Sequence, residues 1–121
     1  MRSRWITHRG KAIFYCDYSG FRDDVQALEA ENREVIAELT RQAPDSVLEL
    51  VDVRGSIGSR DAVNLLKASA SKTRPHIRKS AVVGVEGMVK VLAQAVSRFS
   101  GLGITLFATE EEAKDWLVAD R

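Results

Sequence analysis

The chain has 121 residues, of which 45% are hydrophobic and 29% are charged, and its formal net charge is +1. This length fits one domain, 1–121 with a core at about 11–120, and the composition is that of a globular protein rather than a disordered one. A nearly neutral charge gives the whole molecule no attraction to nucleic acid or to an acidic membrane surface.

The first half of the chain predicts strand, helix and strand. Residues 4–7 are compatible with a short edge strand that turns at Arg9-Gly10, and residues 11–17 form a clear strand ending in the turn 17–20. A helix is expected from about 23 to 42, with Asp23 or Asp24 as its N-cap. Asn32 falls on the apolar stripe of this helix, and we expect it at the edge of that stripe.

The second half repeats the alternation. A buried strand at 47–53 leads through a polar turn into a helix at about 59–71, with Ser59 as its expected N-cap. An apolar strand at 76–85 then precedes a helix at 86–99. The last strand, 104–108, is followed by a helix that opens with the capping box Thr109-x-x-Glu112. Three apolar residues of that helix are expected to point inward: Ala113, Trp116 and Leu117.

This order, strand and helix repeated four times, predicts an α/β fold with a mainly parallel sheet and right-handed crossovers. Strands laid side by side in chain order would place the helices on one face of the sheet. Polar residues interrupt the apolar strands, which would suit a sheet with one face less covered than the other. They are Tyr15, Glu49, Ser80 and Thr105.

In open α/β sheets, ligands and partners meet the loops that leave the carboxyl ends of the strands. We therefore expect these loops to share one rim that binds a partner or a ligand. The residues predicted for this rim are Asp17, Tyr18, Ser19, Asp52, Arg54, Gly55, Ser56 and Gly84.

No residue set in the sequence indicates a reaction. Asp17 and Asp52 could together hold Mg²⁺, but aspartate is also a common turn residue, and a metal is not expected. The glycines around 55 and 84 match neither a P-loop nor a dinucleotide fingerprint. Because His8 and His76 are poorly placed to serve a serine nucleophile, we predict no catalytic residue, no cofactor and no enzyme.

Three further features of the sequence bear on nucleic-acid binding and on the cellular compartment. The basic stretch 67–79 has no interleaved aromatic residues for base stacking, so nucleic-acid binding is not expected. Cys16 is the only cysteine, which excludes an internal disulfide and fits a reducing compartment. With neither a signal peptide's apolar core near the start nor an apolar run of membrane-spanning length, the prediction is a cytoplasmic protein.

Four segments carry a family resemblance: DYSG at 17–20, LELVDVRG at 48–55, AVVGVEGMVKVLAQAVSRFSG at 81–101 and FATEEEAKDWL at 107–117. Together they resemble the bacterial SpoIIAA-like family, over roughly residues 11–120. That family shares its fold with STAS domains, which include anti-sigma-factor antagonists, and more distantly with CRAL-TRIO lipid-transfer domains. The resemblance implies a four-turn β/α superhelix, and in position Ser59 corresponds to the serine that is phosphorylated in the antagonists, although the D-S-S-G-L-G type motif around it is absent.

Three functions follow as hypotheses. The preferred one is a non-enzymatic regulatory module that binds a protein partner at the rim, with Ser59 as a candidate phosphorylation site and a homodimer as an option. The alternative is a carrier of a small apolar or lipid-like ligand, held at the less covered sheet face or beside Phe107 and Trp116. The third is an enzyme that acts on a phosphorylated compound through Asp17 and Asp52.

Overall fold

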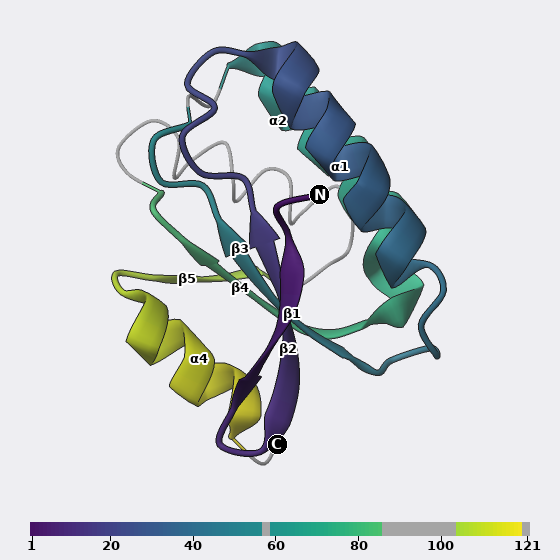
Figure 1. The fold of residues 1–121 in the computed structure, drawn as a ribbon, viewed down its shortest axis with the longest axis vertical. Helices are drawn as coiled ribbons and strands as arrows, with labels where there is room; N and C mark the ends of the chain where they lie inside the picture. The colour runs from purple at the N-terminus through teal and green to yellow at the C-terminus, as the bar shows by residue number, and fades with distance from the viewer. Residues whose placement is uncertain (57–58, 86–103, 120–121) are drawn as a thin grey trace.

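The computed structural model describes residues 1–56, 59–85 and 104–119. Within these ranges the chain forms a sheet, three α-helices and one 3₁₀ turn (Figure 1). The elements in chain order are β1 (Arg4–His8), β2 (Lys11–Asp17), α1 (Val25–Leu39), β3 (Val47–Asp52), α2 (Arg60–Thr73), η1 (Arg74–His76), β4 (Ile77–Val83), β5 (Ile104–Phe107) and α4 (Glu110–Val118).

The sheet has the strand order β1-β2-β3-β4-β5, so neighbours in the sequence are neighbours in the sheet. β2 to β5 are parallel, as the alternation of strands and helices predicts. β1 pairs with β2 antiparallel and confirms the additional edge strand. The hairpin turns through Arg9 and Gly10, whose φ angles of 51° and 80° suit the twist of a tight hairpin.

Helices cover both faces of the sheet, and each face has its own apolar core (Figure 1). α1 and α2 pack on the face that presents Phe14 and Cys16. α4 packs on the opposite face, against Ile13 and Leu50. The expectation of helices on one face holds for the crossover helices α1 and α2, but α4 follows the last strand, makes no crossover, and folds back over the other side.

The polar residues within the strands are paired inside these cores. Ser80 Oγ donates to Glu49 Oε1 at 2.9 Å, and the Cys16 thiol lies 3.4 Å from Glu49 Oε2; all three side chains are buried under α1 and α2. Tyr15 is buried on the α4 side. These interruptions therefore mark hydrogen-bonded groups within covered faces, and only Thr105 is exposed.

Asn32 corrects one expectation. Its side chain is buried rather than at the edge of the α1 stripe, and its Oδ1 accepts a hydrogen bond of 2.7 Å from the hydroxyl of Tyr18. A buried phenol needs a partner, and a side-chain amide on the inward face of α1 supplies it.

The helix starts agree with the predicted capping residues. Asp24 accepts from the amide of Ala27 at α1, Ser59 from that of Ala62 at α2, and Thr109 from that of Glu112 at α4. The helix predicted at 86–99 lies outside the described residues. Among the helices that are described, none has the length and apolar character needed to cross a membrane.

Candidate binding rim

The residues predicted for the rim do come together at one edge of the sheet. β2, β3 and β4 end side by side, with Asp17 opposite Asp52 and Asp52 opposite Val83 in the register. The loops that leave β2 and β3 lie at this edge, away from the hairpin that joins β1 to β2 (Figure 1). We call the set Asp17, Tyr18, Ser19, Asp52, Arg54, Gly55, Ser56 and Gly84 the rim.

Main-chain hydrogen bonds join the loop after β2 to the loop after β3. The amide of Tyr18 donates to the carbonyl oxygen of Asp52 at 2.9 Å, and that of Gly20 donates to the carbonyl oxygen of Arg54 at 2.7 Å. Further along, the amide of Arg22 donates to the carbonyl oxygen of Gly55 at 2.9 Å. The two loops thus continue the parallel pairing of β2 and β3 beyond the strands, which gives the rim a fixed main-chain shape.

Ser56 fastens the same two loops through its side chain. Its hydroxyl donates to the carbonyl oxygen of Tyr18 and accepts from the amide of Phe21 at 3.2 Å. Both hydrogen-bonding roles of the hydroxyl are therefore used inside the rim. Ser19 is engaged as well, because its hydroxyl donates to Asp17 Oδ1 at 2.6 Å.

Gly84 lets the loop after β4 approach the loop after β3. Its φ of +92° lies in the left-handed region, and a Cβ at this position would lie 2.4 Å from Cγ and 2.6 Å from the amide nitrogen of Arg54. A side chain here would collide with main chain that cannot swing away. At this point the main chain of the loop after β4 packs directly against that of the loop after β3.

A buried carboxylate anchors the rim on the α4 face of the sheet. Asp52 Oδ1 accepts from the amide of Arg54 at 3.0 Å and from its Nε at 2.9 Å, and Oδ2 accepts from Nη2 at 2.7 Å and from the hydroxyl of Tyr15. The same guanidinium reaches Glu110 Oε1 at 3.1 Å, which ties the start of α4 to the rim. Asp52 is fully engaged by these donors.

The charges of this cluster are set by burial and by the hydrogen bonds. Burial acts to raise the pKa of Asp52, but the hydrogen bonds from Arg54 and Tyr15 outweigh it and hold that pKa below its ordinary value. Burial, followed by the hydrogen bond to Asp52, raises the pKa of Tyr15 to about 12. The hydrogen bond to Asp52 raises the pKa of Arg54 as well. At neutral pH the cluster therefore holds an ionised carboxylate, a neutral phenol and a guanidinium.

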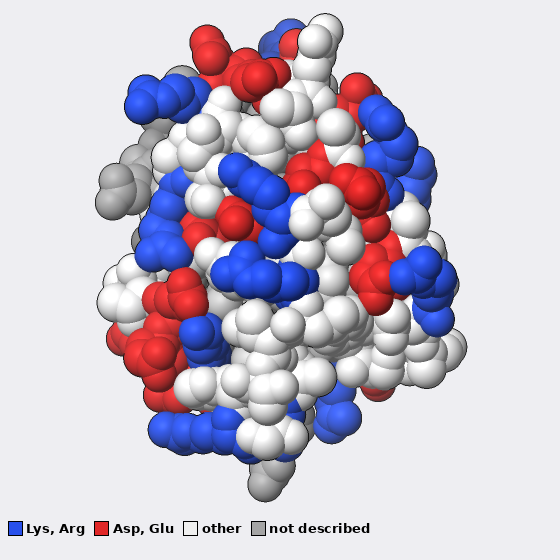
Figure 2. All heavy atoms as spheres, in the orientation of Figure 1, with Lys and Arg blue, Asp and Glu red and all other residues white. Residues whose placement is uncertain are grey.

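Asp17 is in a more open setting and is reached by the N-terminal segment. Arg2 Nη2 donates to the carbonyl oxygens of Asp17, at 3.0 Å, and of Ser19, at 2.6 Å, while Arg4 lies 3.7 Å from Asp17 Oδ2. Ser3 is buried behind them and donates from its amide and hydroxyl to Glu31 of α1. Basic and acidic side chains are interspersed over the face on which β1 lies in front, without one dominant sign (Figure 2).

The side chains that contact the rim include three that the sequence did not indicate: Arg2, Tyr15 and Glu110. Strand alternation places Tyr15 on the same face as Asp17, and the parallel register then brings it beside Asp52, so this contact was accessible once the register was known. Arg2 and Glu110 lie far from Asp17 and Arg54 in the sequence, and only the tertiary fold brings them near.

The remaining predicted site residues have these positions. Ser59 is the N-cap of α2, and its half-buried side chain accepts from the amide of Ala62 at 3.2 Å. Phe107 and Trp116, named for the apolar-ligand alternative, pack on each other with ring centroids 5.5 Å apart, and Lys79 Nζ lies 4.6 Å from the Trp116 ring. His76 lies in η1, and its Nδ1 is 2.8 Å from the carbonyl oxygen of Gln42.

Comparison with models of protein families identifies the family of the chain. Among curated proteins, none matches the chain significantly. The family model described as SpoIIAA-like matches residues 8–118, which is nearly the whole chain. Together with the parallel sheet and its edge strand, this match shows that the chain belongs to the SpoIIAA-like family.

Proposed function

We propose that the protein is a non-enzymatic regulatory module that binds a protein partner through the rim, in the manner of anti-sigma-factor antagonists. The observation that carries the proposal is the direct hydrogen bonding of the loops after β2 and β3. Because this main chain is fixed before a partner arrives, binding costs little ordering of the rim itself. Membership of the SpoIIAA-like family supports the same reading.

The environment of the rim carboxylates supports binding over catalysis. Asp52 is surrounded by Arg54 and Tyr15, and its pKa is held low, so it is a poor general acid or base near neutral pH. Asp17 accepts from the Ser19 hydroxyl and faces Arg2 and Arg4. Both groups act in this account as supports for the rim's shape.

Ser59 extends the proposal to regulation. It lies at the start of α2, next to the rim, where a phosphate would meet the first amides of the helix and could pair with Arg60. A phosphate there would reverse the local charge without unfolding the cap, since an anionic group is favoured at a helix N-terminus. Partner binding would then change while the fold persists.

Site-specific photo-crosslinking in cells tests the partner surface. A photo-reactive residue at Arg60, exposed beside the rim, is compared with one at Lys72, exposed in the last turn of the same helix. The proposal predicts that Arg60 yields a protein adduct of defined mass and that Lys72 does not. Adducts from Lys72 alone, or equal adducts from both positions, would contradict a partner surface at the rim.

A charge change on Ser59 tests the regulatory part. Ser59→Asp keeps a capping side chain, so α2 should persist, and Ser71→Asp places the same charge on the exposed surface near the other end of the helix. We expect Ser59→Asp to alter the adduct formed from Arg60 while Ser71→Asp leaves it as in the wild type. An identical adduct yield in all three proteins would remove Ser59 from the account and leave the partner surface standing.

A further inference from the structure

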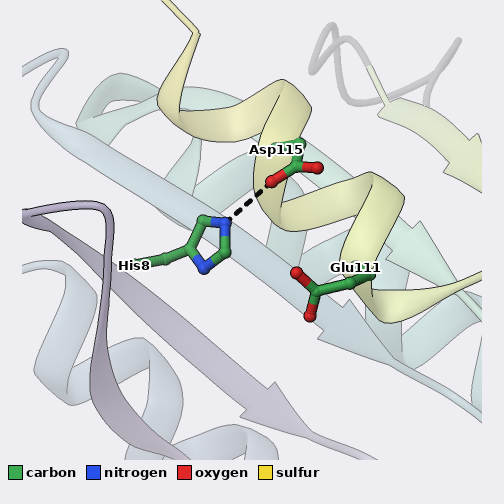
Figure 3. A group of neighbouring side chains, drawn as sticks. All are labelled: His8, Glu111 and Asp115. Carbon is green, nitrogen blue, oxygen red and sulfur yellow. Dashed lines mark hydrogen bonds and ion pairs between the residues drawn. The ribbon is translucent and has the colours of Figure 1, made fainter.

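A second cluster of side chains lies outside the rim, between the β1–β2 hairpin and α4. His8 is the last residue of β1, and Glu111 and Asp115 lie one turn apart on α4. Figure 3 shows the two carboxylates on the side of α4 that faces the imidazole. His8 is paired with Lys11 at the start of β2, so it lies at the opposite end of that strand from Asp17.

The three side chains are close enough to share one ion. One ligand atom from each of them lies within 4.8 Å of the others, and His8 Nε2 is 2.9 Å from Asp115 Oδ1. In a tetrahedral zinc site with bonds of about 2.0–2.2 Å, ligand atoms are about 3.4 Å apart. Small side-chain rotations therefore convert the observed cluster into such a site, because residues four apart on a helix project to the same side.

The donor types favour a particular class of metal. One imidazole nitrogen with two carboxylate oxygens is a ligand set that Zn²⁺ accepts with a water in the fourth position. Mg²⁺ and Ca²⁺ prefer oxygen ligands alone, so the histidine argues against both.

One neighbouring cation competes for the same oxygen. Arg9 Nη2 lies 3.4 Å from Asp115 Oδ1, but its side chain is largely exposed and can turn into solvent. Such an exposed ion pair contributes little to stability, so a divalent ion can displace it. Removing the Arg9 side chain should therefore strengthen zinc binding.

We propose that His8, Glu111 and Asp115 bind one Zn²⁺ ion and that the ion fastens the β1–β2 hairpin to α4. The two carboxylates supply two negative charges to the ion, and the neutral imidazole supplies the third ligand. His8 and Asp115 are 107 residues apart in the sequence, so zinc binding would close a long loop of the chain. The fourth coordination position remains open to water or to an outside group.

Zinc titration of the whole chain, by calorimetry after treatment with a chelator, tests the site. One ion per chain is expected, and His8→Gln should weaken binding by about tenfold or more, since it removes a metal ligand. His76→Gln is the matched control, because His76 lies in η1, outside the cluster. Unchanged affinity in His8→Gln, or a loss in His76→Gln of the same size, would overturn the proposal.

Arg9→Gln separates a metal site from a simple ion pair. If Zn²⁺ and Arg9 compete for Asp115, this variant should bind Zn²⁺ at least as tightly as the wild type and should gain more thermal stability on adding Zn²⁺. Circular dichroism of each variant without metal verifies that it is folded. A wild-type chain that takes up no Zn²⁺, or an Arg9→Gln chain that binds it more weakly, contradicts the assignment.

Discussion

Asp17 and Asp52 end neighbouring strands at the same register position, yet their surroundings differ. The side chain of Asp52 is 2% exposed and receives every donor it needs from Arg54 and Tyr15, whereas that of Asp17 is 18% exposed and faces two arginines at 3.4 and 3.7 Å. The stability of the rim therefore depends mainly on the buried charge of Asp52 and only weakly on Asp17.

Asp52→Asn should therefore destabilise the protein far more than Asp17→Asn. Asparagine keeps one acceptor oxygen but replaces the other with an NH2 group, which cannot accept from Arg54 or Tyr15. Arg54 also loses its charged partner, and hydrogen bonds to a charged group are worth about 1.5–3 kcal/mol. Asp17→Asn should cost about 0–1 kcal/mol, as expected for a more exposed pair. Urea unfolding of the two variants measures the difference, and equal losses would show that Asp52 is no anchor.

Glu49 makes stability depend on pH in a way opposite to Asp52. Burial raises the pKa of Glu49 in the folded protein above that in the unfolded chain. The stability that this group contributes is present below its unfolded pKa of about 4.5 and is lost as the pH rises through its folded pKa. Glu49→Gln removes this dependence and keeps an acceptor for Ser80.

The free energy of unfolding of the wild type, relative to Glu49→Gln, should accordingly fall as the pH rises from about 4.5 through the folded pKa of Glu49. Glu31 is a control of opposite sign: burial acts to raise its pKa, but hydrogen bonds from Ser3 and Arg2 hold that pKa below the ordinary value. Its contribution is present at neutral pH and is lost in acid, so Glu31→Gln should be most destabilising at neutral pH. Parallel pH curves for wild type and Glu49→Gln would refute the assignment to Glu49.

At the scale of elements, the fit between the loops after β3 and β4 depends on a missing side chain. Gly84→Ala places a Cβ against the main chain of Arg54, in addition to the cost of about 1–2 kcal/mol for a left-handed backbone. Gly10→Ala meets that backbone cost alone, because nothing lies within 4 Å of its Cβ. Thermal unfolding should therefore show a clearly larger loss for Gly84→Ala than for Gly10→Ala, and similar losses would indicate that the two loops are not tightly packed.

Elements are also the level at which the sequence was most informative. Strand alternation, the helix-capping residues Asp24, Ser59 and Thr109, and the turn at Arg9-Gly10 are local signals, and the structure agrees with each of them. Asn32 was misplaced because a helical stripe does not reveal which inward position meets a phenol. That phenol belongs to Tyr18, which lies in the loop after β2 and not on α1.

At the scale of the whole molecule, the rim could be anticipated and its supports could not. Parallel strands in chain order must bring the ends of β2, β3 and β4 to one edge, so periodicity alone predicts the meeting of Asp17, Asp52 and Gly84. The contact of Arg54 with Glu110, and that of His8 with Asp115, depend on α4 folding onto the second face of the sheet. No local sequence pattern predicts which face of the sheet α4 covers.

If the rim binds a protein partner, native mass spectrometry of the chain purified gently from cells should detect the complex. We expect a species heavier than the chain by the mass of a protein. This species should separate into both components under stronger activation and should be less abundant in Ser59→Asp. A phosphate on Ser59 would appear in the same spectrum as an added mass on the free chain. A chain that carries only a small apolar molecule, with no protein bound in the wild type, would contradict the account and favour a ligand carrier.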